Sequence, residues 1–441
     1  MTKQVKSENY QFGVFDHNGI LRGKWIPEGK LENALTKGIR MPGSILACDI
    51  WGQDRVSNEY VQKGGDSDLI CMPTGRQMLP LPWLKNNNSH LIHGWMLNED
   101  GSVFPGDPRG ELYTMVQRFH SHDLFPVVAF ELEFYLIDKD SIKPQPIFLE
   151  SQNRQLNRDS ILSLDELNDL GDFFREIENA ALKQGISTGG ISSENGPSQY
   201  EINLKHTRDP LKAADDALLM KRIIKGVAVN HGFKATFMAK PYGERAGSSM
   251  HVHISILDKH GQNIFDDEVA DGPEQLKHAI GGLLEQFDDC FLLFAPHLNS
   301  YRRFLPGLLA PVNASWGQEN RTTAIRVPGG PSGSRRIEHR LAGSDTNPYL
   351  VLAVVLGGIF NGLEHKTDPG DPVSGFTAKR SLNTVPPNWG AAIARFFHSK
   401  KMVQIFSDQF IDMYITTKTY EFEELAKTVS TAEIEAYLDA C

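Results

Sequence analysis

The chain has 441 residues, of which 40% are hydrophobic and 23% are charged, as is typical of a globular enzyme. Its length favours two domains over one. The 45 lysine and arginine residues are outnumbered by 55 aspartate and glutamate residues, which gives a formal net charge of -10. An acidic chain without a dense basic run is not expected to bind nucleic acid.

Cysteine usage and the N-terminal segment predict a cytoplasmic protein. The four cysteines stand far apart and form no CxxC pair, which favours free thiols in a reducing compartment. They are Cys48, Cys71, Cys290 and Cys441. The segment MTKQVKSENYQFG lacks the apolar region of a signal peptide. The longest apolar stretch, residues 349–363, is too short and too rich in glycine to span a bilayer, and it predicts a core helix.

The first part of the chain, from about residue 13 to 105, has short apolar runs separated by glycine, proline and asparagine. These runs predict a small sheet. They read GILRGKWIP, SILACDIWG, DLICMP, LPLPW and HLIHGWML. We therefore expect a β-rich N-terminal domain over residues 13–108 and a catalytic domain over residues 109–441.

The second part begins with helical spacing in GELYTMVQRFHSH, residues 110–122. Strand-like segments then alternate with longer helical segments, which predicts an α+β or α/β catalytic domain. The expected strands are PVVAFELEFYLID, SQYEINL, ATFMAKP, SSMHVHISIL, TTAIRVP and RRIEHRLA. The expected helical segments lie near 164–184, 210–231, 272–297, 347–365 and 388–437.

The strand-like segment FELEFY, residues 130–135, has two carboxylates on one face. Because side chains alternate along a strand, Glu131 and Glu133 point the same way, with their Cα atoms roughly 6.5 to 7 Å apart. Phe130, Leu132 and Phe134 point the other way. Two carboxylates on one face of a strand with apolar flanks must be stabilised by water, by opposite charges or by a bound cation.

Three other expected strands repeat this pattern of one polar face. In the first, Glu201 shares a face with Gln199 and Asn203, and Glu194 lies seven residues upstream in a loop-like segment. The polar faces of the other two are Ser249, His251, His253 and Ser255, and Arg336, Glu338 and Arg340.

Two interpretations of these faces compete. Each strand on its own fits a half-exposed antiparallel strand whose polar face meets water. Solvent-facing strands, however, usually carry lysine, threonine and glutamine, whereas these carry glutamate, histidine and arginine. The alternative is a curved sheet whose concave face binds divalent cations, because gathered carboxylates without a cation would raise one another's pKa. Oxygen-rich ligation with one imidazole suits Mg²⁺ or Mn²⁺ better than zinc.

Arginines are frequent in the segment that follows. Guanidinium groups bind phosphate and carboxylate bidentately. The group comprises Arg303, Arg321, Arg326, Arg336 and Arg340. Alone it fits a surface ion-pair network as well as a binding site, but beside a two-metal site it indicates phosphoryl transfer. The chain has no GxxxxGK[ST] loop, and GGPSGS at 329–334 is expected to be a flexible loop.

The ordered motifs of this chain resemble those of the glutamine synthetases, and within them the branch that joins glutamate to organic amines, the γ-glutamylpolyamine synthetases. The resemblance covers nearly the whole chain. The motifs include SDLICMPTGRQMLPLPW, FELEFY, ENGPSQYEINL, ATFMAKPYGERAGSSMHVHIS, NSYRRFLPGLLAPVNASWG, NRTTAIR, RRIEHR and NPYL. It implies an N-terminal β-grasp domain and a guanido-kinase-like catalytic domain with a curved antiparallel sheet.

The resemblance also implies ligands and binding residues. Glu133, Glu194 and Glu201 would hold one divalent cation. Glu131, His251 and Glu338 would hold the other. The remaining assignments are Gly247 and Arg303 to glutamate, Arg321, Arg326 and Arg336 to nucleotide phosphates, Ser255 to the nucleotide, and Arg340 to the acyl phosphate. His253 is expected to contact the nucleotide or support a ligand, or to be a satisfied structural histidine.

The expected activity is ATP-dependent ligation of the γ-carboxylate of glutamate to an amine, a polyamine such as putrescine first, through γ-glutamyl phosphate. Leu309 in PGLLAP stands where ammonia-using members have a glutamate, which favours an amine that carries carbon. The DGSS loop of bacterial ammonia-using members is also missing, and CDIWGQDR, with Asp49 and Asp54, roughly takes its place. The alternatives are a glutamine synthetase that uses ammonia and a non-catalytic relative. The resemblance further implies a homo-dodecamer of two hexameric rings.

Overall fold

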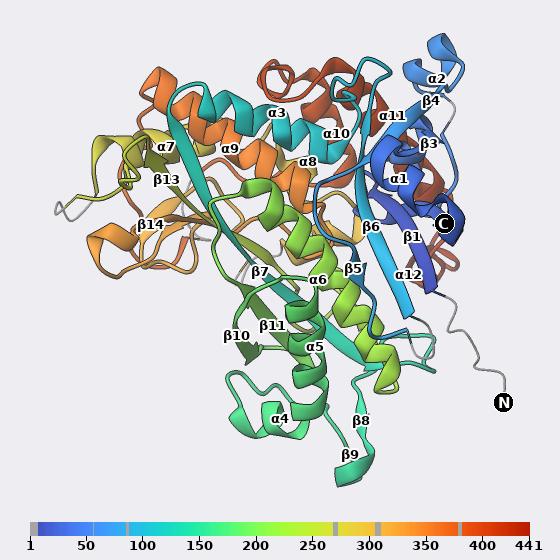
Figure 1. Cartoon of the computed structure of the whole chain (residues 1–441). Coiled ribbons are helices and arrows are strands. Elements are labelled where there is room, and N and C mark those ends of the chain that lie inside the picture. Colours follow the sequence, from blue (N-terminus) through green and yellow to red (C-terminus); the bar gives the residue numbers. More distant parts are fainter. Residues whose placement is uncertain (1–7, 56, 85–87, 268–271, 305–309, 378–381) are drawn as a thin grey trace.

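The described residues form two large sheets, which lie side by side in the computed structural model (Figure 1), and one small hairpin. The structure describes residues 8–55, 57–84, 88–267, 272–304, 310–377 and 382–441. The described residues form helices and strands up to His339 and helices after it, so the predicted α+β class is confirmed. The domain boundary expected at residues 108 and 109 stays a prediction.

The N-terminal sheet has six strands in the order β2-β1-β6-β4-β3, with β5 paired to β6. Its strands are β1 (Glu8–Phe15), β2 (Leu21–Ile26), β3 (Ile39–Pro42), β4 (Asp68–Pro73), β5 (Leu79–Pro80) and β6 (Asn88–Leu97). Two short helices, α1 (Leu31–Lys37) and α2 (Glu59–Gly64), accompany it. The small sheet predicted from the apolar runs is therefore present.

One of those apolar runs, SILACDIWG, is not a strand, and its prediction as one was wrong. Residues Gly43–Ala47 form a 3₁₀ helix whose Leu46 is fully buried. The backbone of this turn does not hydrogen-bond to a neighbouring strand at Ser44, whose N–H donates to the Asp66 carboxylate at 3.0 Å. Burial alone gives a short apolar run no preference for a strand over a helical turn.

The larger sheet has eight strands in the order β10-β11-β7-β13-β16-β15-β14, with β12 paired to β7. Its pairs are antiparallel except for β14 and β15. The strands are β7 (Leu124–Asp138), β10 (Thr188–Ser193), β11 (Gln199–Leu204), β12 (Phe233–Thr236), β13 (Met250–Asp258), β14 (Trp316–Gln318), β15 (Ile325–Val327) and β16 (Ile337–His339). A separate hairpin joins β8 (Phe148–Leu149) to β9 (Arg154–Gln155).

Helices cover the apolar face of this sheet. Phe130, Leu132 and Phe134 of β7 are at most 1% exposed, and they share one core with the helix residues Ile223 and Val227. Figure 1 shows α5 and α6 in front of β7, with α3 and α9 above. The helices are α3 (Pro108–His120), α4 (Leu164–Asp169), α5 (Gly171–Lys183), α6 (Pro210–Asn230), α7 (Glu274–Glu285), α8 (Phe291–Phe294) and α9 (Pro348–His365).

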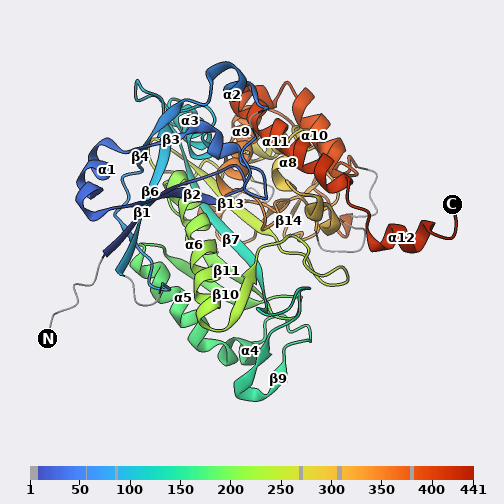
Figure 2. The same ribbon diagram turned by 90° about the vertical axis from the view of Figure 1, so that its right-hand side faces the viewer.

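The last helical segment, expected over 388–437, is three helices in the structure. They are α10 (Trp389–His398), α11 (Asp408–Ala426) and α12 (Thr431–Tyr437). Ser407 and Ser430 begin α11 and α12, since their hydroxyls accept backbone N–H groups of the first turn. In Figure 2, α12 lies at the edge of the molecule beside the C-terminus.

Helix α9 is the predicted core helix. It begins at Pro348, and the Asn347 side chain caps its first turn by accepting the Tyr349 N–H at 2.9 Å. By length and composition alone α9 could cross a membrane. However, 78% of its most apolar window is buried inside the protein, which is the environment of a core helix.

Glycines allow α7 and α9 to pack closely. A Cβ placed on Gly282 of α7 would lie 2.1 Å from the Gly358 carbonyl oxygen and 2.6 Å from the Gly362 Cα atom. Both contacts are with backbone, which cannot move as a side chain can. This contact therefore requires glycine on steric grounds.

We expect Gly282→Ala to destabilise the protein by about 1 to 3 kcal/mol, because overpacking forces the two helices apart. Thermal unfolding would measure the effect. Gly64→Ala in α2 is the matched control, since a Cβ there meets nothing within 4 Å. Equal melting temperatures for the two variants would contradict the packing argument.

Candidate functional site

The strand register gathers acidic side chains on the polar face of the larger sheet. Glu133 of β7 is opposite Glu201 of β11, and Glu131 is opposite His251 of β13. On the other edge of β13, His253 is opposite Glu338 of β16. We call the group Glu131, Glu133, Glu194, Glu201, His251, His253 and Glu338 the carboxylate cluster.

Burial of this cluster excludes a water-facing strand surface. Glu133, His251 and Glu338 are 8%, 7% and 1% exposed. Charged side chains are rarely so buried unless they are paired or hold a metal ion. The half-exposed interpretation of these three strands is therefore wrong.

Two histidines hold Glu131. Its carboxylate is 3.0 Å from His251 Nδ1 and 2.8 Å from His253 Nε2. Burial raises the pKa of Glu131, but the hydrogen bonds and charges of the two histidines outweigh burial and leave it well below its usual range. Glu131 is therefore ionised at neutral pH.

The proton position on His253 follows from its neighbours. The Arg336 Nε–H donates to His253 Nδ1 at 3.1 Å, and an arginine can only donate. Nδ1 is therefore the acceptor, and Nε2 carries the proton that is donated to Glu131. With both ring nitrogens engaged, His253 fits a supporting role better than direct ligation.

Crowding raises the pKa of the other acids. Burial and then the neighbouring Glu194 raise the pKa of Glu133 to about 8, although its carboxylate accepts the Ser249 N–H at 2.8 Å. Burial and the charges of Glu131, Glu133 and Glu194 raise the pKa of Glu201 to about 9. These carboxylates lack enough positive charge around them to be fully ionised at pH 7.

The cluster fits divalent cations by its donor set. Among the described residues, two groups bring their ligand atoms within 4.8 Å of one another: Glu131, Glu201 and His251, and Glu131, His253 and Glu338. Carboxylate oxygens with one imidazole suit Mg²⁺ or Mn²⁺. Glu131 belongs to both groups, and neither group coincides with one of the two expected ligand sets. The division of the six expected ligands into two sets stays a prediction.

Three arginines surround Glu338 and Glu131. Arg326 Nη1 donates to Glu338 Oε2 at 2.6 Å, Arg340 Nη1 donates to Glu338 Oε1, and Arg336 contacts His253. Burial raises the pKa of Glu338. The nearby charges, led by His251 and Arg340, have a larger opposite effect, so the pKa of Glu338 lies below its usual range. Burial raises the pKa of Glu194, and the charge of exposed Arg321 opposes only part of that rise.

Arg303 is different because, among the described residues, no carboxylate forms an ion pair with it, although the charges of Glu133 and Asp345 act on it. It is 1% exposed, and it donates to the Leu341 carbonyl and the Ser249 hydroxyl, both at 3.0 Å. Burial lowers its pKa to about 10, so it remains charged at pH 7. Gly247 packs against it, since a Cβ there would lie 2.4 Å from Arg303 Cγ.

The remaining candidate residues have no hydrogen bond or ion pair with the carboxylate cluster among the described contacts. Ser255 is half-buried on β13. Asp54 accepts the Ser44 hydroxyl at 2.7 Å, and Asp49 pairs with Arg55 at 3.1 Å, so both are bound within the N-terminal part. Leu309 lies outside the described residues.

Two residues of the site received no role from the sequence. Gln199 donates to the Gly247 carbonyl at 3.0 Å and contacts Glu133 at 3.4 Å. Because Gln199 lies on the same strand face as Glu201, the sequence alone could have placed it in the site. Glu319 pairs with Arg326 at 3.1 Å, and nothing in the sequence singled it out.

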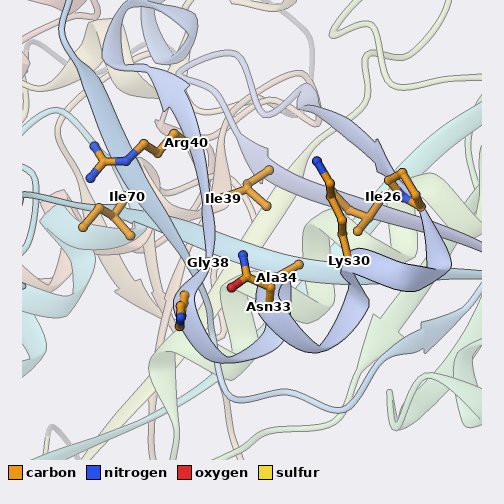
Figure 3. Close-up of a pocket in the computed structure, with 10 residues that line it drawn as sticks. Ile26, Lys30, Asn33, Ala34, Gly38, Ile39, Arg40 and Ile70 are labelled. Atoms are coloured by element: carbon orange, nitrogen blue, oxygen red, sulfur yellow. The ribbon is translucent and has the colours of Figure 1, made fainter.

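A separate hollow lies on the N-terminal sheet. It has a volume of about 420 Å³, and aliphatic residues and lysines line it, including Ile26, Lys30, Ala34 and Ile39 (Figure 3). No carboxylate lines it, and it contains none of the candidate ligands. Chemistry rather than volume therefore places the candidate site at the carboxylate cluster.

Comparisons with known proteins identify relatives of the whole chain. Residues 105–437 match the family model described as glutamine synthetase, catalytic domain. The chain is 36% identical over 423 residues to the γ-glutamylputrescine synthetase PuuA of Escherichia coli strain K12, covering 95% of this chain and 89% of the relative. It is 31% identical over 442 residues to the glutamate–isopropylamine ligase of a Pseudomonas species, covering 98% and 95%.

A solved structure described as apo GmaS without ligand is similar in fold. It superposes with a TM-score of 0.85 at 24% identity and covers 98% of this chain and 97% of that one. The similarity extends over both sheets.

We expect Mg²⁺ to raise the melting temperature of protein from which metal has been removed. The rise should be larger at pH 9 than at pH 6. The folded-state pKa values of Glu133 and Glu201 are raised, so without metal the folded protein holds protons that the unfolded chain has lost. Its stability therefore falls as pH rises from about 5 to 9. A bound cation competes with those protons and reverses the trend.

Melting temperatures with and without Mg²⁺ after chelation would test this expectation. Glu201→Gln should lose most of the gain from Mg²⁺, whereas Glu32→Gln on the exposed surface of α1 should keep it. A full gain in Glu201→Gln would show that the cation binds elsewhere.

Proposed function

The chain belongs to the glutamine synthetase family, and we propose that it joins the γ-carboxylate of L-glutamate to an organic amine with ATP. The chain is thus an ATP-dependent carbon–nitrogen ligase. The observation that carries the proposal is the buried carboxylate cluster with arginines beside it. The two relatives named for glutamate–amine ligation support the amine as acceptor.

Divalent cations are part of the proposal. Glu133, Glu194 and Glu201 would hold one, and Glu131, His251 and Glu338 the other. When bound, Mg²⁺ or Mn²⁺ supplies positive charge to the phosphoryl group during its transfer. Arg336 and His253 keep the Glu131 carboxylate oriented through the hydrogen bonds described above.

The arginines take the anionic parts of the substrates. Arg321, Arg326 and Arg336 would contact nucleotide phosphates, with Ser255 and His253 on the nucleotide side. Arg340 would contact the acyl phosphate. Oriented guanidinium groups stabilise charge as it develops, without rearranging during the reaction.

Arg303 and Gly247 would hold the substrate glutamate. Arg303 is buried and charged, and no carboxylate in the described part of the chain forms an ion pair with it, so a substrate carboxylate would add to the compensation that Glu133 and Asp345 give at a distance. Its two protein contacts fix its terminal nitrogens while leaving further N–H groups to donate.

The reaction would proceed in two steps. The γ-carboxylate of glutamate attacks the γ-phosphorus of ATP, ADP leaves, and γ-glutamyl phosphate forms. The neutral amine then attacks the acyl carbon, phosphate leaves, and the amine loses a proton. Water must be kept out, because it would hydrolyse the acyl phosphate.

The acceptor is proposed to be an amine that carries a carbon chain, with putrescine first. The leucine at position 309 supports this choice, because leucine adds apolar surface where a carboxylate would attract ammonium. Ammonia as acceptor, which would make the chain a glutamine synthetase, is the second candidate, supported by the family match and by relatives named glutamine synthetase that are 32% identical to this chain.

Assembly and location belong to the same proposal. A homo-dodecamer of two hexameric rings is supported by the family resemblance, and a cytoplasmic location by free cysteines, three of which are buried. Sedimentation of the purified protein would test the assembly, and a monomer with full activity would overturn it.

We expect a γ-glutamylamide from an organic amine to form at least tenfold faster than glutamine. The measurement is ATP-dependent phosphate release with glutamate and Mg²⁺ across ammonium, putrescine, spermidine, ethanolamine, isopropylamine and aniline, with products identified by mass. Glutamine as the fastest product would establish the ammonia reaction instead. No turnover with any acceptor would favour a non-catalytic relative.

We expect Arg303→Lys to raise the KM for glutamate about 10- to 100-fold, because a lysine cannot replace a bidentate guanidinium. The KM for ATP should change little. Steady-state kinetics would measure both, with Arg302→Lys on the neighbouring exposed arginine as the control. A change in the KM for ATP alone would place Arg303 at the nucleotide.

A further inference from the structure

Glu319 connects two parts of the site that the mechanism treats separately. It follows β14 directly, and its carboxylate reaches β15 and the segment beyond it. Oε2 accepts from Arg326 Nη2 at 3.1 Å, and Oε1 accepts the backbone N–H of Gly329. One side chain thus links a phosphate-binding candidate to the start of the GGPSGS segment.

Arg326 is held from two sides. Its Nη1 donates to Glu338 Oε2 at 2.6 Å, and its Nη2 donates to Glu319. Glu338 is a candidate metal ligand, so a cation would share that carboxylate with Arg326. Glu319 is not in the carboxylate cluster, so a cation bound by the cluster would not compete for its contact with Arg326.

The backbone at Glu319 is unusual. Its φ is +52°, in the left-handed region that glutamate rarely adopts. The adjacent Asn320 fixes the loop, since its side-chain amide donates to the carbonyls of Val373 and Gly375 at 2.9 and 2.8 Å. Strained backbone that is held by its surroundings is frequent at functional sites.

Space around the carboxylate is also limited. A Cβ on Gly329 would lie 2.9 Å from Glu319 Oε1. Because Oε1 is the end of a flexible side chain, a Cβ at position 329 would push the carboxylate away from the Gly329 backbone.

We propose that Glu319 is a positioning residue that holds Arg326 and the segment beginning at Gly329 on the nucleotide-phosphate side of the carboxylate cluster. This inference rests on the proposed function, in which Arg326 contacts phosphate. Glu319 touches neither substrate. It acts by restricting where the Arg326 guanidinium points, which lowers the entropy lost when phosphate binds.

Glu319→Asn separates positioning from stability. Asparagine tolerates the left-handed backbone better than glutamate, but its shorter side chain does not reach Arg326. We expect an unchanged or higher melting temperature, a KM for ATP raised about fivefold or more, and an unchanged KM for glutamate. Glu319→Gln keeps the length and should show a smaller rise. The control is Glu99→Asn, which removes a surface ion pair with Arg40 far from the site.

Calorimetry with the non-hydrolysable analogue AMP-PNP and Mg²⁺ tests the same point without turnover. Weaker binding to Glu319→Asn than to the wild type, with rank order wild type, Gln, Asn, supports the proposal. Equal or tighter binding to both variants would overturn it, since tighter binding would mean that Glu319 only offsets the charge of Arg326. Wild-type protein that binds AMP-PNP but ligates no amine would instead refute the proposed function.

Discussion

The antiparallel pairing of β7 with both β11 and β13 is the constraint on which the site depends. It sets Glu133 opposite Glu201 and Glu131 opposite His251 on one face. A slip of one residue would turn these carboxylates into the helix-covered core and expose Phe130 and Leu132. The apolar face therefore fixes the register, and the register brings the charges together.

The carboxylates of the cluster fall into two groups, which differ in how their negative charge is compensated. Glu131 and Glu338 are ionised because histidines and arginines contact them, whereas Glu133 and Glu201 have raised pKa values because burial and like charges dominate there. Protein groups thus compensate the charge of Glu131 and Glu338, whereas Glu133 and Glu201 would be neutralised by protons or by a bound cation. That asymmetry fits a site where metal ions and arginines act together on a phosphoryl group.

The parts of the fold that could be predicted are those with a strong period. Phe130 to Phe134 alternate without interruption, so the amino-acid sequence alone predicts the two faces of β7. Strand β14 has three residues, too few for a period, and the break between α10 and α11 depends on a serine cap at Ser407. The family motifs pointed to the six expected ligands, but the pairing of Glu319 with Arg326 arises where β14 and β15 run parallel, which sequence spacing does not reveal.

The two faces of the larger sheet contribute differently to folding and to the candidate site. Its apolar face packs against helices that in turn pack closely through Gly282 and Gly362, and this side supplies the folding free energy. Its polar face opposes folding, because buried carboxylates with raised pKa values destabilise the metal-free protein at neutral pH. Such a site persists only because the opposite face is well packed, and a cation that binds the cluster recovers part of the loss. Metal binding, as proposed, would therefore couple stability to catalysis through β7 and the two strands paired with it.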